Sequence, residues 1–203
     1  MKRILLINLL AFLTSVCYAQ PYEDSIAAFR KHYKQDFLTD ARSPLKADDT
    51  AYLRFYAPDI SYRFKGAFVP TPESANFLMA THSGKYKTFR QYGIVTFRVH
   101  DTMVVLHVYQ NIGLVSKPEY ADDLFIPFTD ESNYGETFGG GRYLDLKISD
   151  VHGNELTIDF NKCYNPYCAF KDGYSCPIPP SENDIKVAIR AGEKLYGKQV
   201  NEN

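Results

Sequence analysis

Two aspartates give this sequence its most specific chemical possibility. Asp145 and Asp159 lie on two alternating segments, 142–149 and 155–161, which predict the two strands of a hairpin. If both apolar faces point to the core and a three-residue loop, 151–153, joins the strands, Asp145 lies directly opposite Asp159. Like charges in this position are unfavourable unless a cation or a shared proton compensates. The pair therefore acts as a general acid and base, holds a cation through its oxygens, or faces solvent beside a neighbouring lysine.

A second group of candidate residues surrounds the same hairpin. Gly140 and Gly141 precede Arg142, and their backbone N–H groups, with the guanidinium, could cradle a carboxylate or phosphate. Alternatively, these glycines form a bulge or let two backbones approach closely. The other candidates are polar and aromatic residues of the second strand and the loop after it, together with one residue of the first strand: Tyr143, Asn161, Tyr164 and Asn165. Such residues either fasten a loop by hydrogen bonds or form the wall of a ligand pocket.

The sequence motifs give little support for metal binding, nucleophilic catalysis or nucleotide binding. The five histidines show no short ligand spacing, and the cysteines do not form the paired knuckles of a zinc site. The sequence has no nucleophile elbow, dinucleotide fingerprint or phosphate-loop lysine. We therefore predict no metal and no cofactor. With 23 basic and 24 acidic residues and no basic run, the chain also does not resemble a nucleic-acid-binding protein.

The first residues predict an exported protein. A basic start, an apolar stretch over 4–13 and a small residue at Ala19 are typical of a secretory signal peptide, 1–19, which is cleaved after Ala19. The apolar stretch is shorter than the roughly 20 residues that span a bilayer, so we expect no membrane span. Lipidation at Cys17 is disfavoured because a small residue does not precede it. We expect a periplasmic or secreted protein.

Three cysteines remain after this cleavage. Cys168 and Cys176 flank a turn-rich segment of a length that can close at disulfide distance, and an oxidising compartment favours that pairing. Cys163 is then the odd cysteine, which we expect to be a buried, small apolar residue.

The elements that position these residues follow from periodicity. Ile26, Phe29, Tyr33 and Phe37 recur at helical spacing and predict an amphipathic helix over 22–38. From residue 52 onward the period changes to two, and short strands alternate with turns. We predict a single β-rich domain over 20–203 that is an antiparallel meander, closed as a small barrel or as a two-sheet sandwich. The prolines between 163 and 183 predict a stiff C-terminal loop that cannot be a central strand.

The C-terminal third also carries a resemblance. Four motifs occur in order: FGGGRYL at 138–144, DFNKCYNPYCAF at 159–170, CPIPPSEN at 176–183 and AGEK at 191–194. They resemble a bacterial and archaeal family catalogued as a domain of unknown function and numbered sixteen eighty-four, most strongly over 124–194. The family pattern usually has Ala at the position of Cys163. No activity is established for the family, so the resemblance implies common descent and transfers no chemistry.

Three hypotheses for function follow from these observations. The first is binding of a small polar or anionic ligand by the residues around the hairpin. The second is a hydrolase that uses Asp145 and Asp159. The third is a structural or envelope-interaction protein, which predicts an exposed apolar patch and no pocket.

Overall fold

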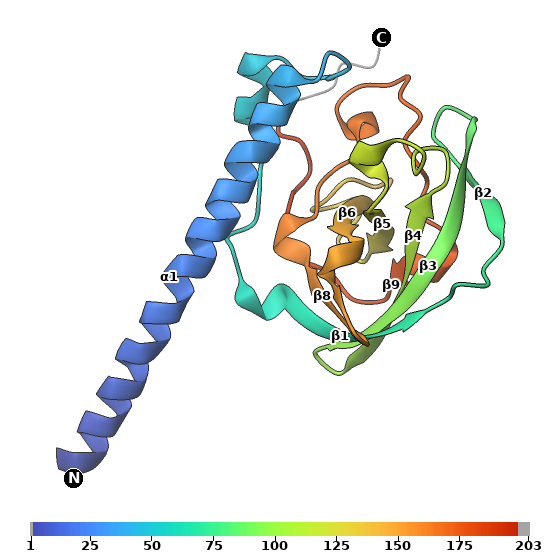
Figure 1. Ribbon diagram of the computed structural model, residues 1–203. Coiled ribbons are helices and arrows are strands. Elements are labelled where there is room, and N and C mark those ends of the chain that lie inside the picture. The colour runs from blue at the N-terminus through green and yellow to red at the C-terminus, as the bar shows by residue number, and fades with distance from the viewer. Residues whose placement is uncertain (1, 199–203) are drawn as a thin grey trace.

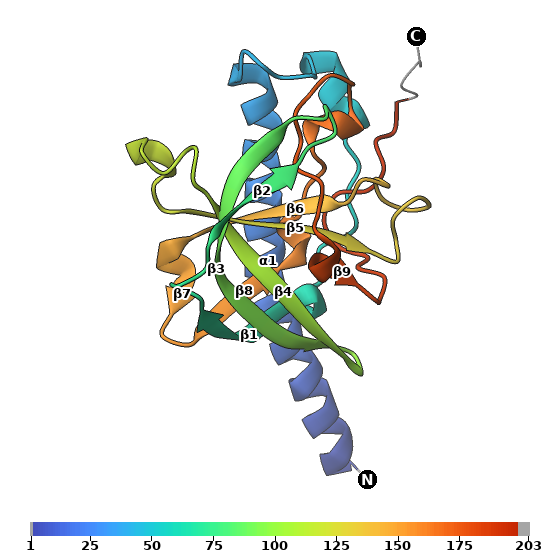
Figure 2. The ribbon, with the colours of Figure 1, turned by 90° about the vertical axis from the view of Figure 1, so that its right-hand side faces the viewer.

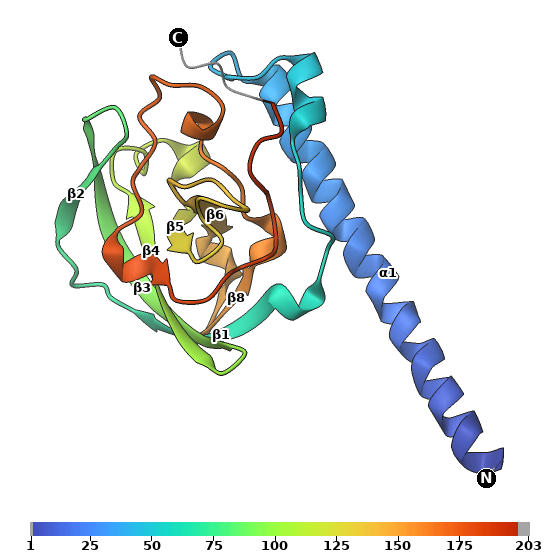
Figure 3. The same cartoon turned by 180° about the vertical axis from the view of Figure 1, so that it is seen from behind.

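The computed structural model describes the backbone of residues 2–198 and the side chains of residues 21–198. One long helix, α1 (Lys2–Thr39), precedes the sheet. Its N-terminal half projects away from the body, whereas its C-terminal half lies along it (Figures 1 and 3). Met1 and the side chains of the predicted signal peptide lie outside the described part, and cleavage after Ala19 stays a prediction. Within the described residues, no helix has the length and apolar character needed to cross a membrane.

The docked half of α1 has the predicted amphipathic face. Ile26 and Phe37 are buried, and Phe29 and Tyr33 between them are half-buried, whereas their neighbours at 27, 28, 35 and 36 are exposed. These four positions recur every three or four residues and so share one side of the helix. The amphipathic helix is confirmed, and its apolar face holds it against the β domain.

Nine strands form one sheet with a mainly antiparallel topology (Figure 2). They are β1 (Arg63–Pro70), β2 (Asn76–Ala80), β3 (Tyr86–Val99), β4 (Thr102–Asn111), β5 (Asp123–Asp130), β6 (Arg142–Lys147), β7 (Val151–His152), β8 (Glu155–Asp159) and β9 (Asp184–Ile185). The order is β6-β5-β4-β3-β1-β8-β7, with β2 paired to β3 and β9 paired in parallel to β5. The mainly β class with an N-terminal helix is confirmed. The sheet is curved but not closed, because within residues 2–198 no ladder joins its end strands, β6 and β7, so it is neither a closed barrel nor two separate sheets.

Short 3-10 helices occupy several connections. They span Ala47–Tyr52, Ile60–Tyr62, Pro118–Tyr120, Ile148–Asp150, Phe160–Lys162, Tyr167–Ala169 and Ser181–Asn183. The first of them ends at Tyr52, where alternation predicts a strand over 52–56. The structure has only an isolated bridge there, between Phe55 and Glu193. Conversely, two strands predicted within 86–99 are the single strand β3, bent by an irregularity between Gln91 and Gly93.

The predicted register of the hairpin after β6 is wrong. A 3-10 turn at Ile148–Asp150 ends β6, and the Asp150 carboxylate accepts the Lys147 N–H at 2.8 Å within that turn. The chain then forms a separate hairpin in which β7 pairs with β8, while β8 pairs on its other side with β1. As a result Asp145 lies opposite Phe125 of β5, and Asp159 lies opposite Arg63 of β1. The two aspartates are not a cross-strand pair.

The two faces of β5 and β6 are both covered. Leu124, Ile126 and Leu144 point into the main core, which is shared with β1, β3, β4 and β8. The opposite face, which carries Phe125 and Tyr143, lies under α1 and the C-terminal loop. This second layer encloses the site described next.

Candidate functional site

A cavity of about 760 Å³ lies between the outer face of the sheet, the C-terminal half of α1 and the loop at 166–177. Phe and Tyr residues are the largest group in its lining. Eight of the aromatic residues come from α1, from β3, β5 and β6, and from the C-terminal loop: Tyr33, Phe37, Phe89, Phe125, Tyr143, Tyr164, Tyr167 and Tyr174. Cavities of this size and character are typical of small-molecule sites.

These eight rings form an unbroken chain of contacts. On the sheet side, the Phe125 ring lies 5.7 Å from Phe89 and 4.8 Å from Tyr143 between centroids, and Tyr143 lies 5.9 Å from Tyr164. The chain continues onto the helix through Tyr164–Tyr33 and Tyr33–Phe37, at 5.7 and 5.0 Å, and onto the loop through Phe37–Tyr167 and Tyr167–Tyr174, at 5.6 and 5.3 Å. The separations fall within the range of favourable aromatic pairs, so the rings support one another as a stiff wall.

Asp145 is the acidic group of this wall. The Tyr164 hydroxyl donates a hydrogen bond to its carboxylate at 2.6 Å. The side chain has accessible surface toward the cavity, and protein surrounds the rest of the carboxyl group. The resulting desolvation raises the pKa of Asp145 to about 6, whereas the hydrogen bond from Tyr164 lowers it. A carboxyl group with this pKa exchanges protons near neutral pH.

Lys87 is the basic group of the cavity. It is half-buried on β3, two residues before the buried Phe89 and therefore on the same strand face. Among the side chains of residues 21–198, none forms an ion pair with its ammonium group. Burial lowers the pKa of Lys87, and the positive charge of Arg42 lowers it further.

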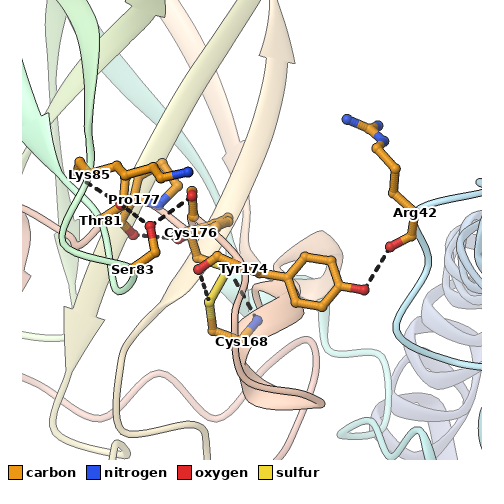
Figure 4. Close-up of a disulfide and its surroundings, with 10 residues drawn as sticks. Arg42, Thr81, Ser83, Lys85, Cys168, Tyr174, Cys176 and Pro177 are labelled. Atoms are coloured by element: carbon orange, nitrogen blue, oxygen red, sulfur yellow. Dashed lines mark hydrogen bonds between the residues drawn. A yellow bond between two sulfur atoms is a disulfide. The ribbon is translucent and has the colours of Figure 1, made fainter.

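A disulfide closes the loop side of the cavity. Cys168 and Cys176 are bonded, as predicted, and Cys163 is free and buried. Figure 4 shows Tyr174, between the two cysteines, donating from its hydroxyl to the Arg42 carbonyl, at 2.8 Å. The Cys176 carbonyl accepts the backbone N–H of His82 at 3.0 Å. The disulfide loop is thus joined to the segment after α1 and to the turn between β2 and β3.

Arg142 points to the opposite face of β6, where it forms contacts within the fold. It is fully buried, and its guanidinium forms an ion pair with Asp130 at 2.7 Å. The same guanidinium donates to the backbone carbonyls of Ile189, Ala191 and Glu193, at 2.7, 2.6 and 3.2 Å. The guanidinium is thus enclosed by partners from the fold itself, and the predicted role of Arg142 in ligand binding stays a prediction.

The neighbouring glycines serve close packing rather than a nest. Gly141 has φ +85°, and a Cβ there would lie 2.5 Å from the Phe128 carbonyl oxygen. At Gly140 a Cβ would lie 2.5 Å from the Phe138 ring. Of the two readings that the sequence left open, close approach is the one these positions support.

Asp159 and Asn161 fasten two segments to β8. The Asp159 carboxylate accepts from the Tyr22 hydroxyl of α1 at 3.0 Å and from the backbone N–H of Asn161 at 3.1 Å. The Asn161 side chain accepts from the Asp59 N–H and donates to the Asp59 carbonyl, at 2.8 and 2.7 Å. Arg63 is 3.8 Å from the Asp159 carboxylate. These contacts explain both residues as loop fasteners.

Asn165 belongs to a buried network around Glu193. The Glu193 carboxylate accepts the Asn165 N–H and the Tyr33 hydroxyl, both at 2.8 Å, while the Asn165 side chain donates to the Lys194 carbonyl. Glu193 is fully buried, and its desolvation raises its pKa to about 7. This carboxyl group, which sequence reasoning missed, links α1 to the C-terminal segment.

The two candidate aspartates still share a wall of a second, smaller cavity. It measures about 240 Å³ and lies where β6 and β8 approach without pairing. Asp145 and Asp159 line it with Arg63, His152 and others. Within the described residues, no group of three or more His, Cys, Asp or Glu side chains is arranged to hold a metal ion.

Comparison with known proteins identifies the family of this chain. A family model described as "Protein of unknown function (DUF1684)" matches residues 49–194. The chain belongs to the DUF1684 family. The match extends the resemblance seen in the C-terminal motifs to all nine strands. A solution NMR structure of an uncharacterised protein from Haloarcula marismortui is similar, with 26% identity and a TM-score of 0.68, over 87% of this chain and 95% of that one. A search of curated proteins finds no match.

In this DUF1684 protein, the site combines predicted and unpredicted residues. Three predicted residues line the large cavity: Tyr143, Asp145 and Tyr164. Two others, Arg142 and Asn161, form hydrogen bonds inside the fold. Lys87 was missed, although its position on the same strand face as Phe89 is a signal that alternation alone could have given. Tyr33 and Phe37 were predicted only as part of the apolar face of the helix, and Tyr167 and Tyr174 of the loop were not predicted as site residues.

Proposed function

We propose that this DUF1684 protein binds a small molecule with a flat or apolar body in the large cavity. The observation that carries the proposal is the chain of eight contacting aromatic rings around a space of about 760 Å³. Burying apolar surface against such rings stabilises a complex, and the few polar groups in the wall give orientation. The Cys168–Cys176 disulfide supports the predicted export, since disulfides persist in oxidising compartments.

A neutral fluorescent probe tests this proposal. N-phenyl-1-naphthylamine gains emission in apolar pockets, and we expect saturable binding to the parent protein. Leu114→Trp places an indole in the cavity and should weaken binding about tenfold or more, because it occupies the volume that the probe needs. Leu78→Trp, at a residue 65% exposed on β2, is the matched control and should leave binding unchanged. Absence of saturable binding, or equal binding by both variants, would contradict the proposal.

A hydrolase remains the second candidate because of one observation. Asp145 and Asp159 line the same smaller cavity although they are not paired across strands. Asp145, whose pKa is about 6, would exchange the proton, while Asp159 is occupied by its hydrogen-bond donors. Screening chromogenic esters, phosphates and glycosides tests this candidate. Turnover that Asp145→Asn abolishes would support it, and no turnover by the parent would remove it. A purely structural role is disfavoured by the large cavity.

A further inference from the structure

We infer that the ligand of the large cavity is an amphiphilic anion, with its apolar body on the aromatic rings and an acidic group paired with Lys87. This inference rests on the proposed function and adds the chemical class of the ligand to it.

The argument begins with the charges that line the cavity. Most of them already have partners. Arg42 is paired with Asp40 at 3.2 Å, and His32 lies 3.6 Å from Asp36. Asp123 accepts Lys147 at 2.5 Å. Each of these groups therefore already has a nearby partner, and it gains less from a ligand of opposite charge than an unpaired group would.

Lys87 differs from these groups. It lines the cavity half-buried, and no side chain within residues 21–198 gives it an ion pair or a hydrogen bond. Partial burial of an unpaired ammonium is unfavourable, because water is removed and nothing replaces it. Arg42 adds a second positive charge nearby, and burial together with this charge lowers the pKa of Lys87. An acidic group of a ligand would supply the missing partner and relieve the repulsion between the two cations.

The remaining acid of the cavity has a different environment. Asp145 already accepts a hydrogen bond from the Tyr164 hydroxyl, and desolvation raises its pKa. Both effects differ from those at Lys87, which has no hydrogen-bond partner among residues 21–198 and a lowered pKa. Lys162, the other lining cation without an ion pair among residues 21–198, is exposed, and its ammonium lies 5.8 Å from the centroid of the Phe29 ring. The wall therefore offers one half-buried unpaired cation, at Lys87, and, at Asp145, a hydrogen-bonded carboxyl group suited to a neutral polar part of the ligand.

Three probes with one shared ring system test the inference. We suggest 2-naphthoate, 2-naphthylmethanol and 2-naphthylmethylammonium, with affinities measured by calorimetry on the purified protein. We expect 2-naphthoate to bind about tenfold more tightly than the alcohol, the effect typical of one charge-assisted hydrogen bond, and the ammonium compound to bind most weakly. Lys87→Met should remove the preference for 2-naphthoate over the alcohol. Lys87→Arg should retain it.

The controls separate the possible failures. Lys85→Met removes an exposed lysine from the same strand region and should leave all three affinities unchanged. An unchanged circular dichroism spectrum and melting temperature show that Lys87→Met folds like the parent protein. If the alcohol binds but 2-naphthoate has no advantage, or Lys87→Met keeps that advantage, the anionic class is wrong while the binding function stands. Tightest binding of the ammonium compound would likewise overturn the anionic class. If none of the three probes binds, the proposed function itself fails.

Discussion

The two faces of β6 place neighbouring charged residues in opposite situations. Arg142 points to one side, where Asp130 and three backbone carbonyls occupy its guanidinium in a fully buried network. Asp145 points to the other side, where, among residues 21–198, one hydroxyl donates to its carboxylate and a large cavity lies beside it. A buried charge with many partners holds the fold together, whereas a charge with few partners beside open space is available to a ligand. Residue type alone does not distinguish these two roles.

The largest effect is expected on the packed face. Arg142→Met leaves the Asp130 carboxylate buried without its partner, and we expect a loss of about 3 to 5 kcal/mol in the free energy of unfolding. Chemical denaturation measures this loss. Arg190→Met breaks an exposed pair with Glu136 at 2.8 Å and serves as the control, with an expected loss of at most about 1 kcal/mol. Equal losses would show that the Arg142 network does not stabilise the fold as described.

The second largest effect is expected at Glu193, which contacts both the cavity wall and the buried Arg142 network. Glu193 binds Tyr33 of the cavity wall, and its backbone carbonyl accepts from Arg142. Its pKa rises from 4.5 in a free side chain to about 7 in the folded protein, so the folded state binds more protons than the unfolded state between these values. Its contribution to stability is therefore present below pH 4.5 and is lost as the pH rises through 7, by up to about 3 kcal/mol.

Glu193→Gln isolates this contribution from other titrating groups. We expect the difference in unfolding free energy between parent and variant to change steadily from pH 4.5 to 7, with the parent losing stability relative to the variant. Denaturation at several pH values measures it. A constant difference across this range would show that Glu193 does not titrate in the folded protein as described.

The disulfide tests whether the cavity wall depends on the loop. Replacing Cys168 and Cys176 by Ala should cost about 2 to 3 kcal/mol, because an unlinked loop has more conformational freedom in the unfolded chain. It should also weaken probe binding, since Tyr174 lies within the closed loop. Cys163→Ala, at a buried cysteine outside the cavity, should retain binding. Retained binding in the double variant would mean that the wall stands without the disulfide.

The smallest effect is expected at Asp145, on the face of β6 that points to the large cavity. Tyr164→Phe removes the hydrogen bond to Asp145, and we expect a loss of about 1 kcal/mol in stability. Because that bond lowers the pKa of Asp145, its removal should raise the pKa further. NMR titration of the carboxyl carbon measures this change. Tyr134→Phe, at a residue 91% exposed, is the control and should leave the pKa unaltered.

Local sequence patterns predicted much of the fold. Helical spacing located the docked face of α1, with Ile26 and Phe37 both buried. Alternation located most strands, and turn length with compartment predicted the Cys168–Cys176 bond. These features depend on contacts between residues that are close in the sequence, where backbone geometry limits the choices.

The register around β6 could not be predicted in the same way. One short 3-10 turn at Ile148–Asp150 directs the chain away from β6, so β8 pairs with β1 and the predicted aspartate pair does not form. Both registers bury the same apolar faces locally, and only the competition among all strands for partners selects one.

By itself, the sequence determined a Tyr- and Phe-rich β domain of the DUF1684 family with one amphipathic helix, one disulfide and a spare buried cysteine. Only the tertiary structure decided that Arg142 is enclosed, that Lys87 has no ion-pair partner among residues 21–198, and that aromatic residues from distant segments surround one cavity. The physical reason is that strand alternation gives each side chain a face but does not say what covers that face. Here α1 and the C-terminal loop cover it, and they leave space above Tyr143 and Asp145.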